Sequence, residues 1–459
     1  MIKPAEAFLT RTLREEIWGK KVARILSASI ASVNPAIALA RALNREKNHL
    51  EVTGRRIDLE DYSNLYLLSI GKAGISMAVA AADLISDHLT GGFVLTKPNS
   101  DDIPARYRNK IQVHQGGHPI PDAMGARSTE KVISCFSQLS ENDLVIVLIS
   151  GGGSALLTAP ASGISLTDIQ QTNRTFLEHG LNIQEINTIR KHLSLVKGGQ
   201  LTDLLQPARM ITLILSDVVG DPMDMIASGP TVPDPSTFKD ALSIIERFQL
   251  EKHLPASVTN HLLAGAEGKV QETPKPGDPI FKDQINLIIA SIQDAIQGGL
   301  EQAQKEGFNP QVISQPLEGE ARLAGENIAE TLIKSSLSEP QVSHCLIAGG
   351  ETTVTLTDVG KPGKGGRNLE LALAAVRKLA GHKGLALVSL ATDGEDSMTD
   401  AAGAIVTGET LSRAEALGLD PDEFLDNHDS YSFFQALDDL LLPGVTGTNV
   451  NDLCFLFSF

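Results

Sequence analysis

Five apolar runs of this chain end abruptly at short turns that are rich in Gly, Ser, Thr or acidic residues. The turns are residues 71–74, 150–154, 216–217, 349–352 and 392–394. In α/β proteins, ligands collect at the carboxyl ends of parallel strands, where such turns expose backbone N–H groups and helix N-termini. Turns that combine lysine, glycine and aspartate favour a site for phosphate, with a divalent metal as a further candidate.

The first of these turns places Lys72 directly after a predicted strand and at the start of a predicted helix. Its ammonium group and the helix N-terminus are two positive elements suited to a phosphate. Gly71 and Gly74 flank the lysine and allow a ligand to approach the backbone closely. A lysine exposed on the surface is the alternative that this motif leaves open.

The second turn consists of Ser150, Gly151, Gly152, Gly153 and Ser154. Consecutive glycines cost conformational entropy, which a purely structural turn rarely needs, so we expect this turn to cradle nucleotide phosphates. The turn is no Walker A loop, because no GxxxxGK[ST] pattern occurs here. It also lacks the third glycine of the dinucleotide pattern GxGxxG.

Further cationic residues lie outside these two turns. Asn187, Arg190 and Lys197 belong to a segment that gathers several cations in an otherwise acidic protein, and we expect them to bind substrate or nucleotide. A solvated helix face is the alternative. Arg367 starts a predicted helix within a glycine loop, where its guanidinium group could clamp a phosphoryl group or a carboxylate. An exposed loop arginine is the alternative there.

Asp217 and Asp393 each follow a predicted strand and are the candidate Mg²⁺ ligands, because one or two carboxylates usually suffice to hold this ion. Either aspartate could instead cap the next helix. Glu351 and Thr352 end the fourth turn, and Asn449 lies in a polar loop that we expect to return to the site.

The bulk composition describes a globular protein with a strong acidic balance. At 459 residues, the chain is expected to form two domains. The net charge of −17 argues against a nucleic-acid surface. Cys135, Cys345 and Cys454 fit no zinc site and are expected to be reduced and buried. We see no signal peptide and no apolar stretch of membrane-spanning length, which predicts a cytoplasmic protein.

Apolar runs alternate with amphipathic segments along the chain, which predicts an α/β fold. The predicted strands are residues 65–70, 92–95, 111–114, 144–149, 211–215, 286–290, 311–314, 345–348, 353–357, 385–390 and 453–459. The predicted helices are residues 5–26, 35–43, 74–85, 123–139, 166–180, 193–205, 237–248, 294–306, 321–333 and 368–379. The proline-rich segment 217–235 predicts an ordered loop or a domain junction. We therefore expect domains at residues 1–236 and 237–459.

Several longer blocks of sequence stand out: GKAG at 71–74, GGHPIPD at 116–122, LISGGGSALL at 148–157, NTIRKHLSLVKGG at 187–199, SDVVGDPMDMIASGPTVPDP at 216–235, GGETTVTL at 349–356, GKGGRNLELAL at 363–373 and TDGEDSMTDAAGA at 392–404. These blocks resemble the glycerate 2-kinase family whose members carry a C-terminal MOFRL domain. The resemblance implies two α/β/α sandwich domains, the N-terminal one Rossmann-like, with the active site in the interdomain cleft.

The same resemblance implies ATP-dependent phosphorylation of D-glycerate at the 2-hydroxyl, with Mg²⁺. The family's lysine in the GKAG turn and its arginine in the GGRN turn map onto Lys72 and Arg367. Glycerate and a nucleotide are the expected partners of a monomer or homodimer, without nucleic acid or membrane. The alternatives are a hydroxypyruvate reductase using NAD(P)H, which the missing dinucleotide fingerprint disfavours, and a non-catalytic sensor of sugar acids.

Overall fold

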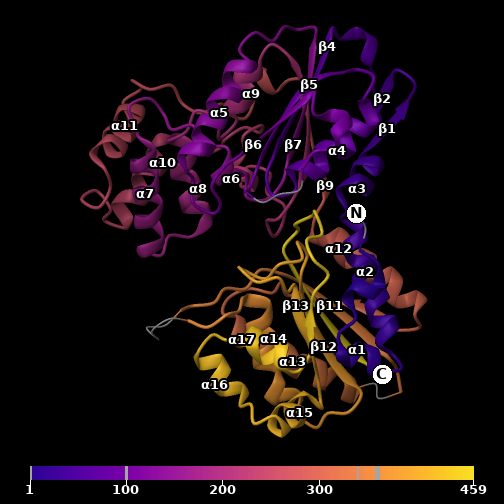
Figure 1. Ribbon diagram of the computed structural model, residues 1–459. Helices are drawn as coiled ribbons and strands as arrows, with labels where there is room; N and C mark the ends of the chain where they lie inside the picture. The colour runs from indigo at the N-terminus through magenta and orange to yellow at the C-terminus, as the bar shows by residue number, and fades with distance from the viewer. Residues whose placement is uncertain (1–2, 99–101, 339–340, 357–361) are drawn as a thin grey trace. The chain divides into compact units, whose positions relative to one another are not determined.

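The computed structural model describes residues 3–98, 102–338, 341–356 and 362–459, which form two compact units (Figure 1). The first, here called the central unit, comprises Leu39–Ile289. The second, here called the terminal unit, combines Met1–Ala38 with Ala290–Phe459. Each unit is built on one six-stranded sheet, and the α/β class predicted from the sequence is confirmed.

The sheet of the central unit has the strand order β6-β5-β4-β7-β8-β9. Its strands are β4 (Asn64–Ile70), β5 (Leu89–Thr96), β6 (Ile111–Gln115), β7 (Asp143–Ile149), β8 (Arg209–Leu215) and β9 (Ile285–Ala290). The pairs β5–β6, β4–β5, β4–β7 and β7–β8 are parallel. Counted along the chain, the order is 3-2-1-4-5-6, so it reverses between β4 and β7, where ligands bind in such sheets.

Helices follow most of these strands and cover the sheet. They are α4 (Gly74–Ile85), α5 (Ala123–Cys135), α6 (Gly153–Leu156), α7 (Leu166–Glu178), α8 (Ile183–His192), α9 (Gln200–Leu205), α10 (Phe238–Arg247) and α11 (Ala256–Ala266). Every residue of β7 is buried, as a strand covered on both faces requires. Leu68 and Ile70 of β4 share one apolar core with residues of α5 and α9, whereas the hydroxyl of Ser69 on the other face donates to the carbonyl of Gly74 in α4.

Helices α7, α8, α10 and α11 enclose a second apolar core of the central unit. Phe176, Ile189, Phe238 and Leu262 are buried in it. The expected boundary between residues 236 and 237 therefore does not divide the two units, because α10 and α11 pack with α8 and β9 joins the sheet. The proline-rich segment 217–235 is an ordered loop inside the central unit and not a domain junction.

The start of the chain belongs to the terminal unit. Helix α2 (Gly19–Ser32) packs along α12 (Ile292–Lys305), and the Ser32 hydroxyl donates to the carbonyl of Asp294 at 2.8 Å. The expected single helix over residues 5–26 is broken into η1 (Ala5–Phe8), α1 (Arg11–Glu15) and α2. The backbone passes close to itself at this break, because a Cβ at Gly19 would lie 1.9 Å from the carbonyl oxygen of Leu13.

Helix α3 (Pro35–Ala42) confirms the helix predicted over residues 35–43, and proline occupies its first position, which suits the missing N–H. The Asn34 side chain accepts a hydrogen bond from the backbone N–H of Ala36. In the described part of the chain, no single helix has the length and apolar composition to span a membrane; α2 and α3 meet that criterion only together, with a bend of 52° between them. A three-stranded antiparallel sheet follows α3 and was not predicted: β1 (Leu43–Glu46), β2 (His49–Val52) and β3 (Arg55–Asp58).

The sheet of the terminal unit is mixed, with the order β10-β11-β15-β12-β13-β14. Its strands are β10 (Asn309–Val312), β11 (His344–Gly350), β12 (Leu385–Ala391), β13 (Gly403–Thr407), β14 (Leu440–Leu441) and β15 (Asp452–Ser458). The C-terminal strand β15 lies between β11 and β12, antiparallel to both, and every residue in it is buried. The prediction that the apolar C-terminus completes a sheet is confirmed.

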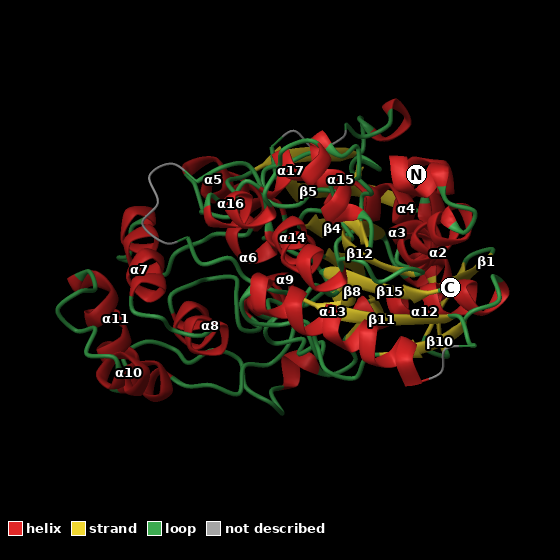
Figure 2. Cartoon of the chain, turned by 90° about the horizontal axis from the view of Figure 1, so that it is seen from below, coloured by secondary structure: helices red, strands yellow, loops and turns green. Residues whose placement is uncertain are grey.

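Helices cover this sheet as well. Besides α1, α2 and α12, they are α13 (Ala321–Ser338), α14 (Arg367–Leu379), α15 (Thr410–Ala416), α16 (Pro421–Asp426) and α17 (Ser430–Ala436). Figure 2 shows α13 and α14 over the strands, and their apolar faces share one core with β11, β12 and β15. The register pairs both Gly350 and Ala391 with Asp452, so the segments that follow β11 and β12 and the loop that precedes β15 meet at one end of the sheet.

Three further expectations are wrong in detail. The helix expected over 193–205 begins only at α9, because Ser194 forms a β-bridge with Pro160 and Gly198 and Gly199 adopt the left-handed conformation. The strand expected over 353–357 is reduced to an isolated bridge between Glu320 and Thr353, and residue 357 lies outside the described residues. Cys135 is exposed, whereas the other two cysteines are buried and unpaired as expected.

The turns after β4 and β7 approach each other so closely that position 71 requires glycine. Its φ is +125°, and a Cβ there would lie 2.4 Å from the carbonyl oxygen of Ser150. We expect Gly71→Ala to destabilise the protein by roughly 2–5 kcal/mol, since the strained backbone costs about 1–2 kcal/mol and overpacking about 1–3 kcal/mol.

Gly268→Ala is the matched control, because Gly268 has a φ of +77° but a Cβ added there would meet no atom within 4 Å. Its cost should be limited to the backbone strain of about 1–2 kcal/mol. Urea denaturation of both variants compares the two costs. Equal losses in the two variants would contradict the close contact between the turns.

Candidate active site

The turns that follow β4 and β7 are joined directly by backbone hydrogen bonds. The N–H of Lys72 donates to the carbonyl of Gly151 at 2.8 Å, and the N–H of Ser150 donates to the carbonyl of Ile70 at 2.9 Å. The buried Ser150 hydroxyl accepts from the N–H of Ala73 at 3.1 Å. Ser150 therefore positions the turn that carries Lys72.

The glycines of the second turn make room for two side chains. Gly152 has a φ of +81° and is the N-cap residue of the short helix α6. A Cβ at Gly152 would lie 2.9 Å from Cδ2 of His118 and 3.2 Å from Cγ of Lys72. The prediction that the GKAG lysine and the SGGGS turn belong to one place is thus supported, and His118 from the GGHPIPD block joins them. Gly74 is buried at the start of α4, beside Ser69 and Val94.

The cationic surroundings act on His118. Burial lowers its pKa, and the charges of Lys72 and Lys97 lower it further, to about 4. The imidazole is therefore neutral at pH 7. The two lysines therefore add to the effect of burial, because nearby positive charge disfavours a cationic histidine.

The loop over residues 217–235 forms a wall beside the second turn. The hydroxyls of Ser154 and Ser228 lie 2.8 Å apart, and Ser228 donates to Oδ1 of Asn187 at 2.9 Å. Ala227 (φ 52°) and Ser228 (φ 61°) both adopt the left-handed conformation, which is costly for residues with a Cβ and concentrates at functional sites. Asn187, predicted to bind ligand, is buried and supports this loop.

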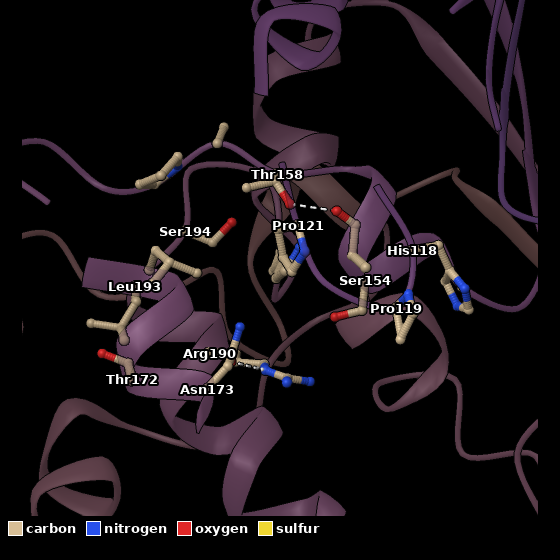
Figure 3. A pocket seen from close by; sticks show the side chains of 16 residues that line it. His118, Pro119, Pro121, Ser154, Thr158, Thr172, Asn173, Arg190, Leu193 and Ser194 are labelled. Atoms are coloured by element: carbon tan, nitrogen blue, oxygen red, sulfur yellow. Dashed lines mark hydrogen bonds between the residues drawn. The ribbon is translucent and has the colours of Figure 1, made fainter. Parts of the chain in front are cut away.

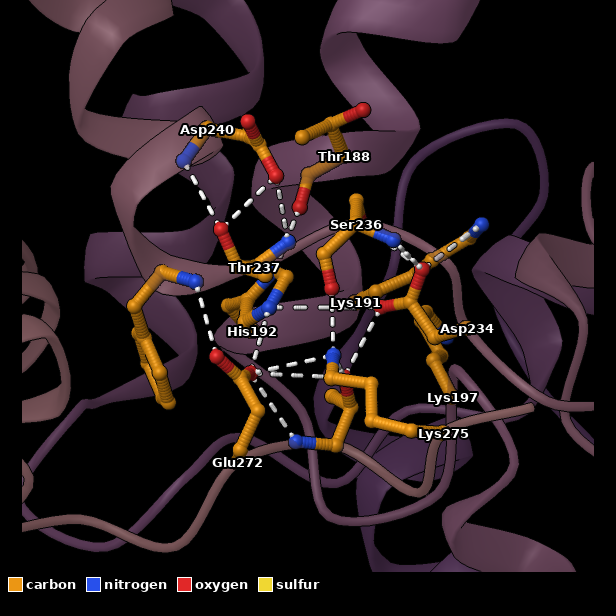
Figure 4. A network of polar contacts seen from close by, with 12 residues as sticks. Thr188, Lys191, His192, Lys197, Asp234, Ser236, Thr237, Asp240, Glu272 and Lys275 are labelled. Atoms are coloured by element: carbon orange, nitrogen blue, oxygen red, sulfur yellow. Dashed lines mark hydrogen bonds and ion pairs between the residues drawn. The ribbon is translucent and has the colours of Figure 1, made fainter. Parts of the chain in front are cut away.

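A polar network ties α8 to the same loop (Figure 4). The Lys191 ammonium lies 2.9 Å from Asp224 and 3.3 Å from Asp234, and both Lys191 and Asp234 are fully buried. Burial alone would raise the pKa of Asp234, but Lys191 and hydrogen bonds from Ser236 lower it below its usual value. The cation contributed by Lys191 is therefore neutralised by carboxylates of the protein itself.

His192 completes this network and is a packing residue. Its Nδ1 lies 2.8 Å from the carbonyl oxygen of Thr188, and its Nε2 lies 2.8 Å from Oε1 of Glu272. Both ring nitrogens are thus engaged within the protein. This leaves the ring no nitrogen for a substrate.

A pocket of about 180 Å³ opens beside the second turn (Figure 3). Its lining comes from the GGHPIPD block, from α6 and the residues after it, and from α7 and α8. The polar groups in the lining are His118, Ser154, Thr158, Thr172, Asn173, Arg190, Ser194 and Lys197. Arg190 and Lys197, two residues predicted to bind substrate or nucleotide, therefore lie in one pocket with the glycine turn.

In the terminal unit, Arg367 begins α14 and is bound by two carboxylates. Its Nη1 donates to Oε1 of Glu351 at 2.6 Å, and its Nη2 donates to Oδ1 of Asp452 at 3.3 Å. The carboxylate of Asp452 is buried, while 34% of the Arg367 side chain stays exposed. Glu351 was predicted as a site residue, whereas Asp452 was not.

Asp396 holds the start of α14 from the other side. Its carboxylate accepts from the N–H of Leu369 at 2.8 Å, and a Cβ at Gly366 would collide with it. Burial raises the pKa of Asp396 to about 7; the hydrogen bond from Leu369 opposes this rise and the charge of Asp452 adds to it. Asp396 was not among the residues predicted from the sequence to belong to the site.

The remaining predicted residues of the terminal unit lie at the same end of its sheet. Thr352 and Asn449 are buried. The carboxylate of Asp393 accepts from the N–H of Glu395 at 3.2 Å, and no helix begins in the described segment after it. The alternative interpretation of Asp393 as a helix cap is therefore wrong.

The candidate metal ligands Asp217 and Asp393 are each half-buried, and each is the second residue after its strand, β8 or β12. Within the described ranges, no group of three or more His, Cys, Asp or Glu residues is arranged to hold a metal ion. Mg²⁺ commonly needs only one or two carboxylates beside phosphates and waters, so single aspartates at strand ends suit it. Their role as ligands stays a prediction.

Comparison with known proteins covers nearly the whole chain. The domain of unknown function DUF4147 matches residues 21–263, and the MOFRL family matches residues 344–452. The chain is 38% identical to the glycerate 2-kinase of Pyrococcus horikoshii over 94% of this chain and 95% of that protein. It is equally similar, at 38% over 94% of this chain and 92% of its length, to an Agrobacterium vitis protein with the provisional name hydroxypyruvate reductase.

A solved structure agrees with these sequence relationships. The crystal structure of glycerate kinase from Thermotoga maritima matches with a TM-score of 0.81 and 37% identity, covering 96% of this chain and 99% of that one. The match therefore extends over both units. On sequence and fold together, the chain belongs to the glycerate 2-kinase family.

Proposed function

We propose that this protein transfers the γ-phosphoryl group of ATP to the 2-hydroxyl of D-glycerate, giving 2-phosphoglycerate and ADP. One observation carries the proposal: the Lys72 side chain lies across Gly152 at the reversal point of a parallel sheet, beside a pocket with two more cations. Relatives in the same family act as glycerate kinases. The proposal takes Mg²⁺ as cofactor and a monomer or homodimer working in the cytoplasm.

In phosphoryl transfer, the protein mainly positions the reactants and neutralises the charge on the transferred group. In the proposal, the backbone of the glycine turn over Gly151 and Gly152 holds nucleotide phosphates, and the Lys72 ammonium neutralises charge on the transferred group. We assign these roles to the two turns because backbone hydrogen bonds fix the turns to each other. A donor that is already fixed needs no reorganisation during the reaction. Mg²⁺, held by Asp217 or Asp393, would supply further charge neutralisation when bound.

Arg367 is the second proposed catalytic cation. Glu351 and Asp452 hold its guanidinium group, and the carboxylates raise its pKa above the usual value despite burial, which by itself lowers it. The arginine therefore stays charged throughout the physiological pH range. Its partly exposed side chain leaves surface for a phosphoryl oxygen.

The reaction itself is tested by offering both candidate substrates in parallel. With D-glycerate and Mg-ATP, we expect ADP release, measured by a coupled enzyme assay. With hydroxypyruvate and NADH or NADPH, we expect no oxidation of the nicotinamide, because the GxGxxG fingerprint is missing. Oxidation of the nicotinamide without any ADP release would instead establish the reductase.

The two catalytic cations are tested by substitution. Lys72→Ala and Arg367→Ala should each lower kcat on the order of 10²-fold or more, because a preorganised charge at the transferred group contributes a few kcal/mol to the transition state. Steady-state kinetics at saturating ATP and glycerate measures the loss.

Matched controls separate this loss from a general effect of removing charge. Arg377 lies on the same helix as Arg367 and also pairs with two carboxylates, Asp420 and Asp422, while Lys239 is an exposed lysine on α10. Arg377→Ala and Lys239→Ala should keep kcat near the wild-type value. Near-wild-type turnover by Lys72→Ala or Arg367→Ala would remove that residue from the mechanism.

A further inference from the structure

Two cations in the pocket of the central unit, Arg190 and Lys197, form no ion pair with a carboxylate of the described residues. In the ranges that the structure describes, Arg190 forms a hydrogen bond to the neutral Asn173, and Lys197 forms one to the carbonyl of Leu157. The neighbouring acids Asp224 and Asp234 are already paired with Lys191. The pocket therefore presents uncompensated positive charge.

Burial makes this arrangement costly without a ligand. It lowers the pKa of Arg190 to about 10. It also lowers the pKa of Lys197, which is 6% exposed, and the charge of Arg190 lowers it further, to about 7. A buried cation is ordinarily paired with an anion, so an anionic ligand would supply the partner that Arg190 and Lys197 lack.

Asn173 sets the direction in which Arg190 can act (Figure 3). The Nε of Arg190 donates to Oδ1 of Asn173 at 2.8 Å, and this fixes the guanidinium plane from α7. The edge formed by Nη1 and Nη2 then suits a planar carboxylate, which it can bind through two parallel hydrogen bonds.

The size of the pocket and its hydroxyl groups point to a small, polar acid. Sites for drug-sized ligands occupy about 300–1,000 Å³, whereas this pocket measures about 180 Å³. Thr172, which lines the pocket and is 1% exposed, has a hydroxyl that is buried without a hydrogen-bond partner among the described residues. A short hydroxy acid fits both properties better than a nucleotide.

We infer that Arg190, oriented by Asn173 and supported by Lys197, binds the carboxylate of the acceptor substrate and so selects short hydroxy acids. The inference rests on the proposed function, since it assigns the acid-binding end of that same site. Arg190 and Lys197 are binding residues in this account, and Asn173 is a positioning residue.

Steady-state kinetics of Arg190→Gln tests the assignment. We expect the KM for D-glycerate to rise about 10–100-fold, the range for losing hydrogen bonds to a charged group, with the KM for ATP unchanged. Arg190→Lys should recover part of the loss, because it restores the charge without the planar fork. Asn173→Ala should raise the KM for D-glycerate by a smaller factor, and Arg174→Gln, at an exposed arginine on the same helix, should leave it unchanged.

The neutral amide of glyceric acid distinguishes carboxylate binding from a structural role. The wild-type enzyme should prefer D-glycerate over glyceramide in kcat/KM, and Arg190→Gln should lose most of that preference. A retained preference overturns the inference. A rise in the KM for ATP with an unchanged KM for D-glycerate also overturns it, because the pocket would then hold phosphate.

Calorimetric titration of D-glycerate into the protein separates this inference from the proposed function, because it needs no turnover. Binding by the wild type that is lost in Arg190→Gln, with an unchanged circular dichroism spectrum, supports the carboxylate site even if no ADP is released. Equal affinity of the two proteins contradicts it.

We expect protonation of Lys197 to accompany the binding of D-glycerate. At pH 8 the free protein holds Lys197 mostly neutral, because its pKa is about 7. A bound carboxylate favours the ammonium form and raises that pKa, so binding should take up protons. Calorimetry in buffers of different ionisation enthalpy measures this uptake, and Lys197→Met should abolish it. An apparent binding enthalpy independent of buffer in the wild type would exclude Lys197 from the carboxylate site.

Discussion

Two backbone hydrogen bonds, from Lys72 to Gly151 and from Ser150 to Ile70, hold the turn after β4 against the turn after β7. The arrangement of the central unit's site depends on this contact. It occurs where the strand order reverses, the place where ligands bind in such sheets, and Lys72, Gly152 and Ser154 are partly exposed there. Only glycine at position 71 permits the approach, and only a residue without a side chain at position 152 leaves space for Lys72 and His118.

Charge is distributed unevenly around this contact. The protein as a whole carries a net charge of −17, yet two adjacent residues of α8 have opposite surroundings. Successive residues of a helix point about 100° apart. Lys191 therefore faces Asp224 and Asp234 and ties down the loop, whereas Arg190 faces the pocket with Asn173 as its partner. The carboxylates lie beside Lys191 and, in the terminal unit, beside Arg367, and so leave the pocket positive.

Local patterns in the sequence predicted most strands and helices, because hydrophobic periodicity and capping act within a few residues. The position of Lys72 after a strand and its association with the SGGGS turn were likewise predictable, since both follow from strand ends in a parallel sheet. The partners of Arg367 were not. Asp452 is 85 residues away and meets Arg367 only because β15 inserts between β11 and β12. The boundary predicted between residues 236 and 237 does not separate the two units for the same reason, because α2 and α12 are distant in sequence and adjacent in space.

The central claim is that the carboxylate of the acceptor substrate neutralises the positive charge of Arg190 and Lys197 in the pocket of the central unit. A crystal structure of the protein with D-glycerate tests it most directly. The account predicts a carboxylate within hydrogen-bond distance of the Nη atoms of Arg190, with Lys197 nearby. A glycerate molecule bound through its carboxylate to other residues, with Arg190 and Lys197 facing only water or a nucleotide phosphate, would contradict it.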